Sequence, residues 1–239
     1  MIVVVGLAFE ARIAAASGLQ VICAGDGRNL RPALHEAITV GCRGLISFGV
    51  AGGLSPDLRA GTCVVASGIV SSNGHVATDR NWSHALLQAM PSAVTGMLAG
   101  ASGPVATPTQ KRALHRATGA LAVDTESHLV ADVAAHYRLP MVALRVICDP
   151  AARTLPDIAL RAIRADGTTD VYMLLRGLLL RPDKVPTLLK IAREARLARA
   201  TLLQCRHVLG AELDTARADE FDAIENVQAE LGPAIGSRL

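Results

Sequence analysis

The sequence predicts an α/β fold, with a β-sheet layered between helices, and three observations lead to this class. Strand-like and helix-like stretches alternate over residues 1–150, which is typical of sheets covered by helices. Hydrophobic residues make up 51% of the chain but aromatic residues only 3%, so Val, Leu, Ile and Ala must build the core. A length of 239 residues allows one large domain or two small ones.

The expected elements follow one another up to residue 150 without a linker-like change in composition. Short apolar runs predict strands at 2–5, 20–23, 44–48, 63–66, 120–123 and 141–147. Helical patterns lie between several of these strands, at 31–40, 82–90, 109–117 and 127–137. Thr109 follows Pro108 and is the expected N-cap of the third helix.

The amino-terminal segment is expected to be a strand and a turn rather than a secretory signal. It lacks a basic start, and Gly6 and Glu10 interrupt its apolar run. No run of eighteen uncharged apolar residues follows, so a membrane-spanning helix is not expected.

The composition of the sequence changes after Pro150. Strand signals stop there, and residues 176–207 are leucine-rich and basic. From Leu188 onward an apolar stripe recurs with helical spacing, whereas Leu189 and Leu197 fall outside it. The stripe comprises Ile191, Ala192, Ala195, Ala198, Leu202 and Leu209. We expect a catalytic core at 1–152, helices completing the same domain at 153–210, and an acidic tail, helical or partly disordered, at 211–239.

Two acidic residues at expected strand ends are candidates for chemistry. Asp149 ends the apolar run that contains strand 141–147, and Glu126 lies in the segment VDTES before the helix 127–137. Ligands of open α/β sheets gather at the carboxyl ends of strands, where a partly desolvated carboxyl group can act as an acid. A carboxylate can also accept hydrogen bonds from two sugar hydroxyls. The alternative is that both groups only cap or stabilise the following helix.

Glycines mark two further segments. ISFGVAGGLSPDLRAG contains Gly49, Gly52 and Gly53, and glycines let backbone amides approach a ligand or anion closely. It matches neither the dinucleotide fingerprint nor a P-loop. In AGDGRNL, Gly27 and Arg28 follow the second expected strand, where the arginine either holds an anion or lies in a solvated turn.

These segments together resemble the nucleoside phosphorylase/nucleosidase family, which includes purine and uridine phosphorylases and the methylthioadenosine/S-adenosylhomocysteine nucleosidases. GLAFEAR is similar to the nucleosidase start, in which a Glu, here Glu10, follows the first strand. GVAGGLSPDLRAGTCVVAS is similar to the family's G-x-AGGL segment. VDTES and LPMVALRVICD are similar to its V-(D/E)-M-E-(S/A) helix start and V-R-x-I-S-D strand.

A narrower resemblance is to the hopanoid-associated phosphorylases, through FGVAGGL, ICDPA and the stretch LRGLLLRPDKVPTLLKIAREAR. Proteins of that group are taken to release adenine from adenosylhopane, a nucleoside joined to a polycyclic lipid. The resemblance implies a three-layer α/β/α fold of the phosphorylase/hydrolase type, with a central mixed sheet and a carboxyl-terminal helical extension.

The resemblance also implies roles for residues. Asp149 protonates or hydrogen-bonds the purine N7 as the glycosidic bond breaks, and Glu126, with Thr125 beneath the ribose, holds the sugar hydroxyls. Arg28, Gly27, Gly49 and Val50 form the pocket for phosphate or water, and Cys148 lies behind the base pocket. Two of these positions depart from the family pattern, because Cys148 replaces a Ser and Val50 replaces a hydroxyl residue.

The nucleophile is left open by this comparison. Arg28 favours phosphate, whereas Glu10 matches the position at which nucleosidases activate water. The resemblance to hopanoid-associated phosphorylases tips the prediction toward phosphorolysis, with inorganic phosphate as co-substrate. Hydrolysis is the alternative, and a non-catalytic nucleotide- or lipid-binding module is the alternative from another class.

The partner expected is a small nucleoside, lipid-linked if the narrower resemblance holds, with no cofactor, no metal and a homodimer or higher homo-oligomer. A net charge of +3 is too weak to indicate nucleic acid. Five scattered cysteines without a CxxC pair favour a reducing cytoplasm. The basic stretch 176–207 has two interpretations, a peripheral contact with the inner membrane surface or ordinary packing on the sheet.

Overall fold

The computed structural model describes residues 1–15, 19–25, 27–157, 160, 164, 166–168, 170 and 185–231. Of these, Val185 and residues 210–231 are described as helix backbone only. The first part of the basic stretch 176–207 lies outside the described residues.

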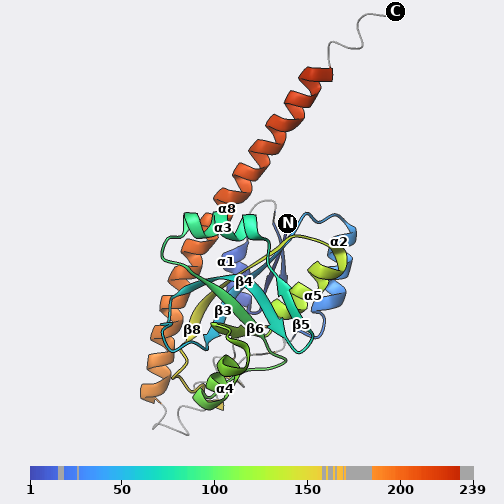
Figure 1. The fold of residues 1–239 in the computed structure, drawn as a ribbon. Coiled ribbons are helices and arrows are strands. Elements are labelled where there is room, and N and C mark those ends of the chain that lie inside the picture. Colours follow the sequence, from blue (N-terminus) through green and yellow to red (C-terminus); the bar gives the residue numbers. More distant parts are fainter. Residues whose placement is uncertain are drawn as a thin grey trace, which may run out of the picture.

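Eight strands form one mixed sheet (Figure 1). They are β1 (Ile2–Val5), β2 (Gln20–Cys23), β3 (Leu45–Gly53), β4 (Cys63–Ser71), β5 (Gly74–Ala77), β6 (Val94–Gly100), β7 (Ala122–Asp124) and β8 (Met141–Asp149). The strands β2, β1, β3 and β8 run parallel to their neighbours in that order. The carboxyl ends of β1, β3 and β8 therefore point toward the same edge of the sheet.

Part of the sheet closes on itself. Strand β8 pairs with both β3 and β4, β4 pairs with β6, β6 with β7, and β7 with the end of β3. A register shift between Ala51 and Gly52 accompanies the turn of β3 from β8 toward β7, as β-bulges do where strands bend. The closure brings the end of β7 beside the ends of β3 and β8.

Helices cover both faces of the sheet, which confirms the predicted three-layer α/β/α architecture with a carboxyl-terminal helix. The helices are α1 (Ala8–Ala14), α2 (Leu30–Thr39), α3 (Arg80–Ala89), α4 (Pro108–Thr118), α5 (Ser127–Tyr137) and α8 (Val185–Leu231). Successive residues of β1 alternate between faces: Ile2 and Val4 pack with α2 and α5, whereas Val3 and Val5 pack with α1, α3 and α8.

Helix α4 begins and ends with strong local signals. Thr107 and Gln110 form a capping box, with Gln110 N donating to Thr107 Oγ1 at 3.2 Å and Thr107 N donating to Gln110 Oε1 at 3.1 Å. Pro108 occupies the first helical turn, and Gly119 ends the helix in the left-handed conformation. The expected N-cap, Thr109, was therefore two residues too late.

Three elements were not predicted. Strands β5 and β6 were missed, and the turn expected after β1 is helix α1. Strand β6 contains Gly96 and Gly100, and glycine weakens the strand signal. Gly96 has a packing reason, because a Cβ there would lie 2.4 Å from Leu121 Cδ1.

Only the second half of the predicted apolar stripe of α8 faces the sheet, since Ala192 and Ala195 are exposed. Ala198, Leu202, Cys205 and Leu209 are buried among side chains of β1, β3, β4 and β8, whereas Leu189 and Leu197, which fell outside the stripe, are exposed. Figure 1 shows α8 running along the body and continuing beyond it. The division at residues 152 and 210 stays a prediction.

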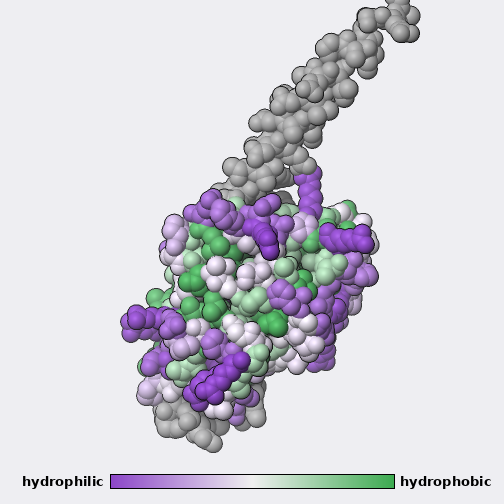
Figure 2. All heavy atoms as spheres, in the orientation of Figure 1, coloured by the Kyte–Doolittle hydropathy of each residue, from purple (hydrophilic) through white to green (hydrophobic). Residues whose placement is uncertain are grey.

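Hydrophilic and hydrophobic residues are interspersed on the face shown in Figure 2. No described helix is both long and apolar enough to cross a bilayer.

The packing of α8 predicts unequal effects of two leucine truncations. Leu202 is 0% exposed and Leu189 is 67% exposed. Leu202→Ala should lower the free energy of unfolding by about 2–5 kcal/mol because it leaves a cavity. Leu189→Ala should change it by no more than about 0.5 kcal/mol. Urea unfolding followed by circular dichroism measures both, and equal effects would show that α8 does not pack on the sheet in solution.

Candidate active site

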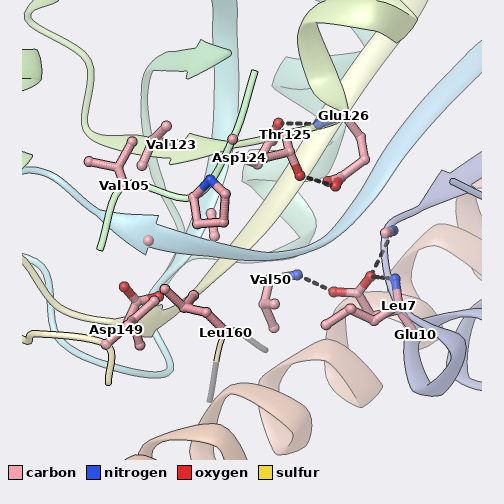
Figure 3. Close-up of a pocket in the computed structure, with 16 residues that line it drawn as sticks. Leu7, Glu10, Val50, Val105, Val123, Asp124, Thr125, Glu126, Asp149 and Leu160 are labelled. Atoms are coloured by element: carbon pink, nitrogen blue, oxygen red, sulfur yellow. Dashed lines mark hydrogen bonds between the residues drawn. The ribbon is translucent and has the colours of Figure 1, made fainter. Parts of the chain in front are cut away.

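One cavity lies where β1, β3, β7 and β8 end, and it contains five of the predicted site residues (Figure 3). Its volume is about 180 Å³. The predicted residues that line it are Glu10, Val50, Thr125, Glu126 and Asp149. In Figure 3, Asp149 lies apart from Glu10 and Glu126, with Val50 between them in the view. The carboxyl groups therefore occupy separate ends of the cavity.

Arg145 connects most of these groups, although it does not line the cavity itself. It lies in the middle of β8 with a fully buried side chain. Its Nε is 2.7 Å from Asp124 Oδ2, and its Nη2 is 3.2 Å from Glu126 Oε2. Nη2 also donates to Ser47 Oγ at 2.7 Å. A buried guanidinium needs such partners, since an unpaired charge in the core is strongly destabilising.

Glu10 is 1% exposed and is held by three backbone amides. Its Oε2 accepts from Gly6 N at 2.9 Å and Leu7 N at 2.8 Å, and its Oε1 accepts from Val50 N at 2.7 Å. Burial raises the pKa of Glu10 to about 7, against the opposing charge of Arg145 and these amide bonds. Near neutral pH the group can therefore exchange a proton, as a general base must.

Glu126 begins helix α5 and lies beside Arg145. Its Oε1 accepts a hydrogen bond from Thr125 Oγ1, and its backbone N donates to Asp124 Oδ1 at 3.0 Å. Burial raises the pKa of Glu126, and the positive charge of Arg145 opposes that rise. A Cβ at Gly6 would lie 2.9 Å from Glu126 Oε1, so only glycine lets β1 approach this carboxylate.

Asp149 ends β8 and is paired with Lys111 of α4. The Lys111 Nζ is 2.6 Å from Asp149 Oδ2, and Lys111 is fully buried. Burial raises the pKa of Asp149, while the Lys111 ammonium acts to lower it. The result is a desolvated carboxyl group at the cavity wall, which is the environment of many general acids.

The other predicted residues do not line the cavity. Gly49 packs against Glu10, since a Cβ there would lie 2.6 Å from Glu10 Oε1. Cys148 is half-buried, and burial raises the pKa of its thiol to about 12, so it stays neutral. Gly27 and Arg28 lie in the turn after β2, and Arg28 is exposed. This turn is joined to the site by Gly25 N, which donates to Gly6 O at 3.2 Å.

Three residues of the site were not singled out from the sequence. Arg145 carried a usable signal, because it is the one charged residue before Asp149 in the nine-residue strand β8, and buried charges are costly unless paired. Asp124 lies next to two predicted residues in VDTES. Lys111 carried no local signal, since its partner is 38 residues away. No cluster of metal-ligating side chains occurs within the described ranges.

Comparison with known proteins places these features in a wider group. A sequence model described as the phosphorylase superfamily matches residues 15–179. No curated protein gives a significant match to the whole sequence.

Solved structures share the fold at low sequence identity. The 5′-methylthioadenosine/S-adenosylhomocysteine nucleosidase from Helicobacter pylori is 15% identical, with a TM-score of 0.64 over 90% of this chain and 97% of that one. The enzyme of that name from S. pneumoniae is 13% identical, with a TM-score of 0.60 over 87% and 98%. The futalosine hydrolase of H. pylori is 16% identical, with a TM-score of 0.58 over 72% and 94%.

The Arg145 ion pairs predict a pH-dependent loss of stability. Arg145→Met should lower the free energy of unfolding by about 3–5 kcal/mol at neutral pH, because it leaves buried carboxylates without a counter-charge. Arg145 opposes the raised pKa values of Glu10 and Glu126, so these values rise further without it. Both groups then take up protons as the pH falls, and the loss should shrink toward about pH 5. Urea unfolding at both pH values measures this, and an equal loss at each would contradict the charge-balance explanation.

Proposed function

Because the chain belongs to the phosphorylase superfamily, we propose that it cleaves the N-glycosidic bond of an adenosine-type nucleoside. The observation that carries the proposal is the single cavity lined by Glu10, Glu126 and Asp149. Cleavage of such a bond requires help for a poor leaving group, a hold on the sugar and a nucleophile. Each of the three carboxyl groups suits one of these tasks.

Asp149 is the proposed acid for the leaving base. A proton or a strong hydrogen bond at the purine N7 lets the base leave as a neutral molecule instead of an anion. Burial raises the pKa of Asp149, which allows its carboxyl group to hold a proton closer to neutral pH. General acid catalysis of this type contributes about 10²–10⁴-fold in rate.

Glu126 is the proposed clamp for the ribose hydroxyls. Arg145 binds one of its oxygens and the Thr125 hydroxyl binds the other, so its orientation is set before substrate arrives. Preorganised charge of this kind stabilises the positive charge that develops on the sugar as the bond breaks. The separation of Asp149 from Glu126 in Figure 3 suits a base and a sugar lying at different ends of one cavity.

Glu10 favours water as the nucleophile. With a pKa of about 7, it can accept a proton from water near neutral pH. The described residues that line the cavity include no Lys, Arg or His, the side chains that most often bind phosphate in proteins. Hydrolysis is therefore better supported by the site than the phosphorolysis that the sequence resemblance favours.

Phosphorolysis is kept as the second candidate because of the turn that contains Arg28. This turn follows β2, which is parallel to β1, and it contacts Gly6 of the cavity through Gly25. An arginine that reaches the cavity from this side in a substrate complex would supply a phosphate ligand.

We infer further that the 5′ substituent of the nucleoside is large and apolar. Apolar side chains line the cavity beside the carboxyl groups, among them Leu7, Val105, Leu155 and Leu160. A lipid-linked, adenosylhopane-like nucleoside has this character, which agrees with the narrower sequence resemblance.

The expected products identify the reaction. Purified protein incubated with adenosine and with 5′-alkylthio analogues should release adenine at equal rates with and without phosphate, and faster for longer alkyl groups. The rate should rise through a pH of about 7, because Glu10 must be ionised to accept a proton and its pKa is raised to about 7. Chromatography of adenine and of the sugar product measures both.

Other outcomes separate the alternatives. Release that depends on phosphate and yields a ribose 1-phosphate product would assign phosphorolysis. No release from any nucleoside would favour a non-catalytic binding module. Asp149→Asn should lower kcat by about 10²–10⁴-fold with the fold intact, whereas Asp57→Asn, at an exposed position, should leave kcat unchanged.

A lipid-linked substrate would require access to a membrane, and we propose that α8 provides it. Ala198, Leu202 and Leu209 face the sheet, but Leu189, Leu197 and Leu203 are exposed. Arg193, Arg196 and Arg199 are also exposed. The acid between them, Glu194, is paired with Arg153. An exposed surface with leucines and with arginines that form no ion pair among the described side chains suits an anionic bilayer.

Sedimentation with vesicles tests this contact. The protein should bind vesicles rich in phosphatidylserine, and binding should weaken as salt is added. The double variant Arg193→Gln, Arg196→Gln should bind less, whereas Arg43→Gln, outside α8, should bind as before. Equal binding to neutral vesicles, or none to anionic ones, would remove the membrane from the proposal.

A further inference from the structure

Lys111 is the most unusual basic residue of the chain. The 24 basic residues include only three lysines, Lys111, Lys184 and Lys190, and Lys111 is 0% exposed. Arginine forms planar, two-pronged contacts, whereas a lysine ammonium is a compact charge with three donors that can point in different directions. A lysine at this buried position therefore suits a cluster of oxygens arranged around one point.

Such a cluster surrounds the Lys111 Nζ. Four oxygens lie within hydrogen-bond distance of it: Asp149 Oδ2 at 2.6 Å and the backbone carbonyl oxygens of Asp149 at 3.0 Å, Pro150 at 3.1 Å and Arg153 at 3.2 Å. The ammonium has three N–H groups, so at least one of them is shared between two oxygens. All four oxygens belong to the end of β8 and the chain that follows it. This stretch continues to Leu155, which lines the cavity.

The position of Lys111 on its own helix gives no reason for a positive charge. It lies in the first turn of α4, just after the capping box of Thr107 and Gln110. A cation near a helix N-terminus opposes the helix dipole and is unfavourable there. The benefit must therefore come from the oxygens that Lys111 contacts.

We propose that Lys111 is a positioning residue for Asp149. Lys111 fixes one oxygen of the Asp149 carboxylate and the chain after β8, so that the acid faces the base. This inference rests on the proposed function, because it assigns Lys111 to the acid of that reaction. The ammonium contacts Asp149 and does not line the cavity, so it acts on the substrate only through the carboxyl group.

The charges around Asp149 determine how the ion pair should affect proton transfer. Lys111 faces it from α4, Glu194 acts on it from α8, and Arg153 and Cys148 are its neighbours along the chain. Burial raises the pKa of Asp149, Glu194 adds to the rise, and Lys111 opposes it. Lys111 thus keeps a desolvated acid able to release its proton to the base.

The pH dependence of kcat/KM tests this role. In Lys111→Gln and Lys111→Met the pKa of Asp149 should rise, so the limb on which activity falls with increasing pH should move up by about one unit or more. The limb that depends on Glu10 should stay in place.

Lys111→Arg keeps the charge and should keep the wild-type profile at a reduced kcat. The matched control Arg112→Gln removes the adjacent exposed cation and should change neither limb. Neutral variants that fold and show an unmoved falling limb would overturn the proposal.

A second measurement needs neither activity nor a neutral Lys111 variant. With only three lysines in the chain, nitrogen-15 NMR of lysine ammonium groups gives a simple spectrum. The Lys111 signal, assigned by its loss in Lys111→Arg, should exchange slowly with water in the wild type and quickly in Asp149→Asn. An unchanged signal in Asp149→Asn would overturn the ion pair. Wild-type protein that cleaves no nucleoside but shows the protected signal would instead overturn the proposed function alone.

Discussion

The buried guanidinium of Arg145 is the constraint on which the rest of the site depends. It lies in the core of the sheet and pairs with Asp124 and Glu126, which belong to other elements than its own strand. Removing a charge from water costs several kcal/mol unless partners replace the water. The fold that buries Arg145 must therefore bring the end of β7 and the start of α5 against the middle of β8, and this arrangement also forms one wall of the cavity.

The site contains more acidic than basic side chains, and this excess of carboxyl groups makes proton transfer possible. Four carboxyl groups line the cavity, those of Glu10, Asp124, Glu126 and Asp149. Among the described residues, Arg145 and Lys111 are the only basic side chains that form ion pairs with them, with Asp124, Glu126 and Asp149. Burial of the excess negative charge raises the pKa of Glu10, Glu126 and Asp149. Groups whose pKa values are displaced toward neutrality can transfer protons, which is why such clusters are common in active sites.

Much of the fold, and part of the site, could be predicted from the sequence. Asp149 and Glu126 follow recognisable strands, and strand ends meet at one edge of a parallel sheet. The partners of these residues could not be predicted in the same way. Lys111 reaches Asp149 only because α4 packs near the end of β8. Helix α1, which was predicted as a turn, has only seven residues and begins with the contacts of Glu10 to Gly6 and Leu7. Local patterns reveal elements, whereas contacts across the chain depend on the completed topology.

Strand β8 also fixes the distance between Arg145 and Asp149. Arg145 and Asp149 are four residues apart on it, which is about 13 Å along an extended chain. A register shift lies between them, because Ala51 of β3 pairs with Ile147 whereas Gly52 pairs with Asp149. Arg145 orients Glu126, the group proposed to hold the sugar, and Asp149 is the group proposed to meet the base. A single inserted or deleted residue between them would turn the Asp149 side chain to the other face of the strand, away from the cavity. The length of this short segment is therefore as constrained as the identity of its two charged residues.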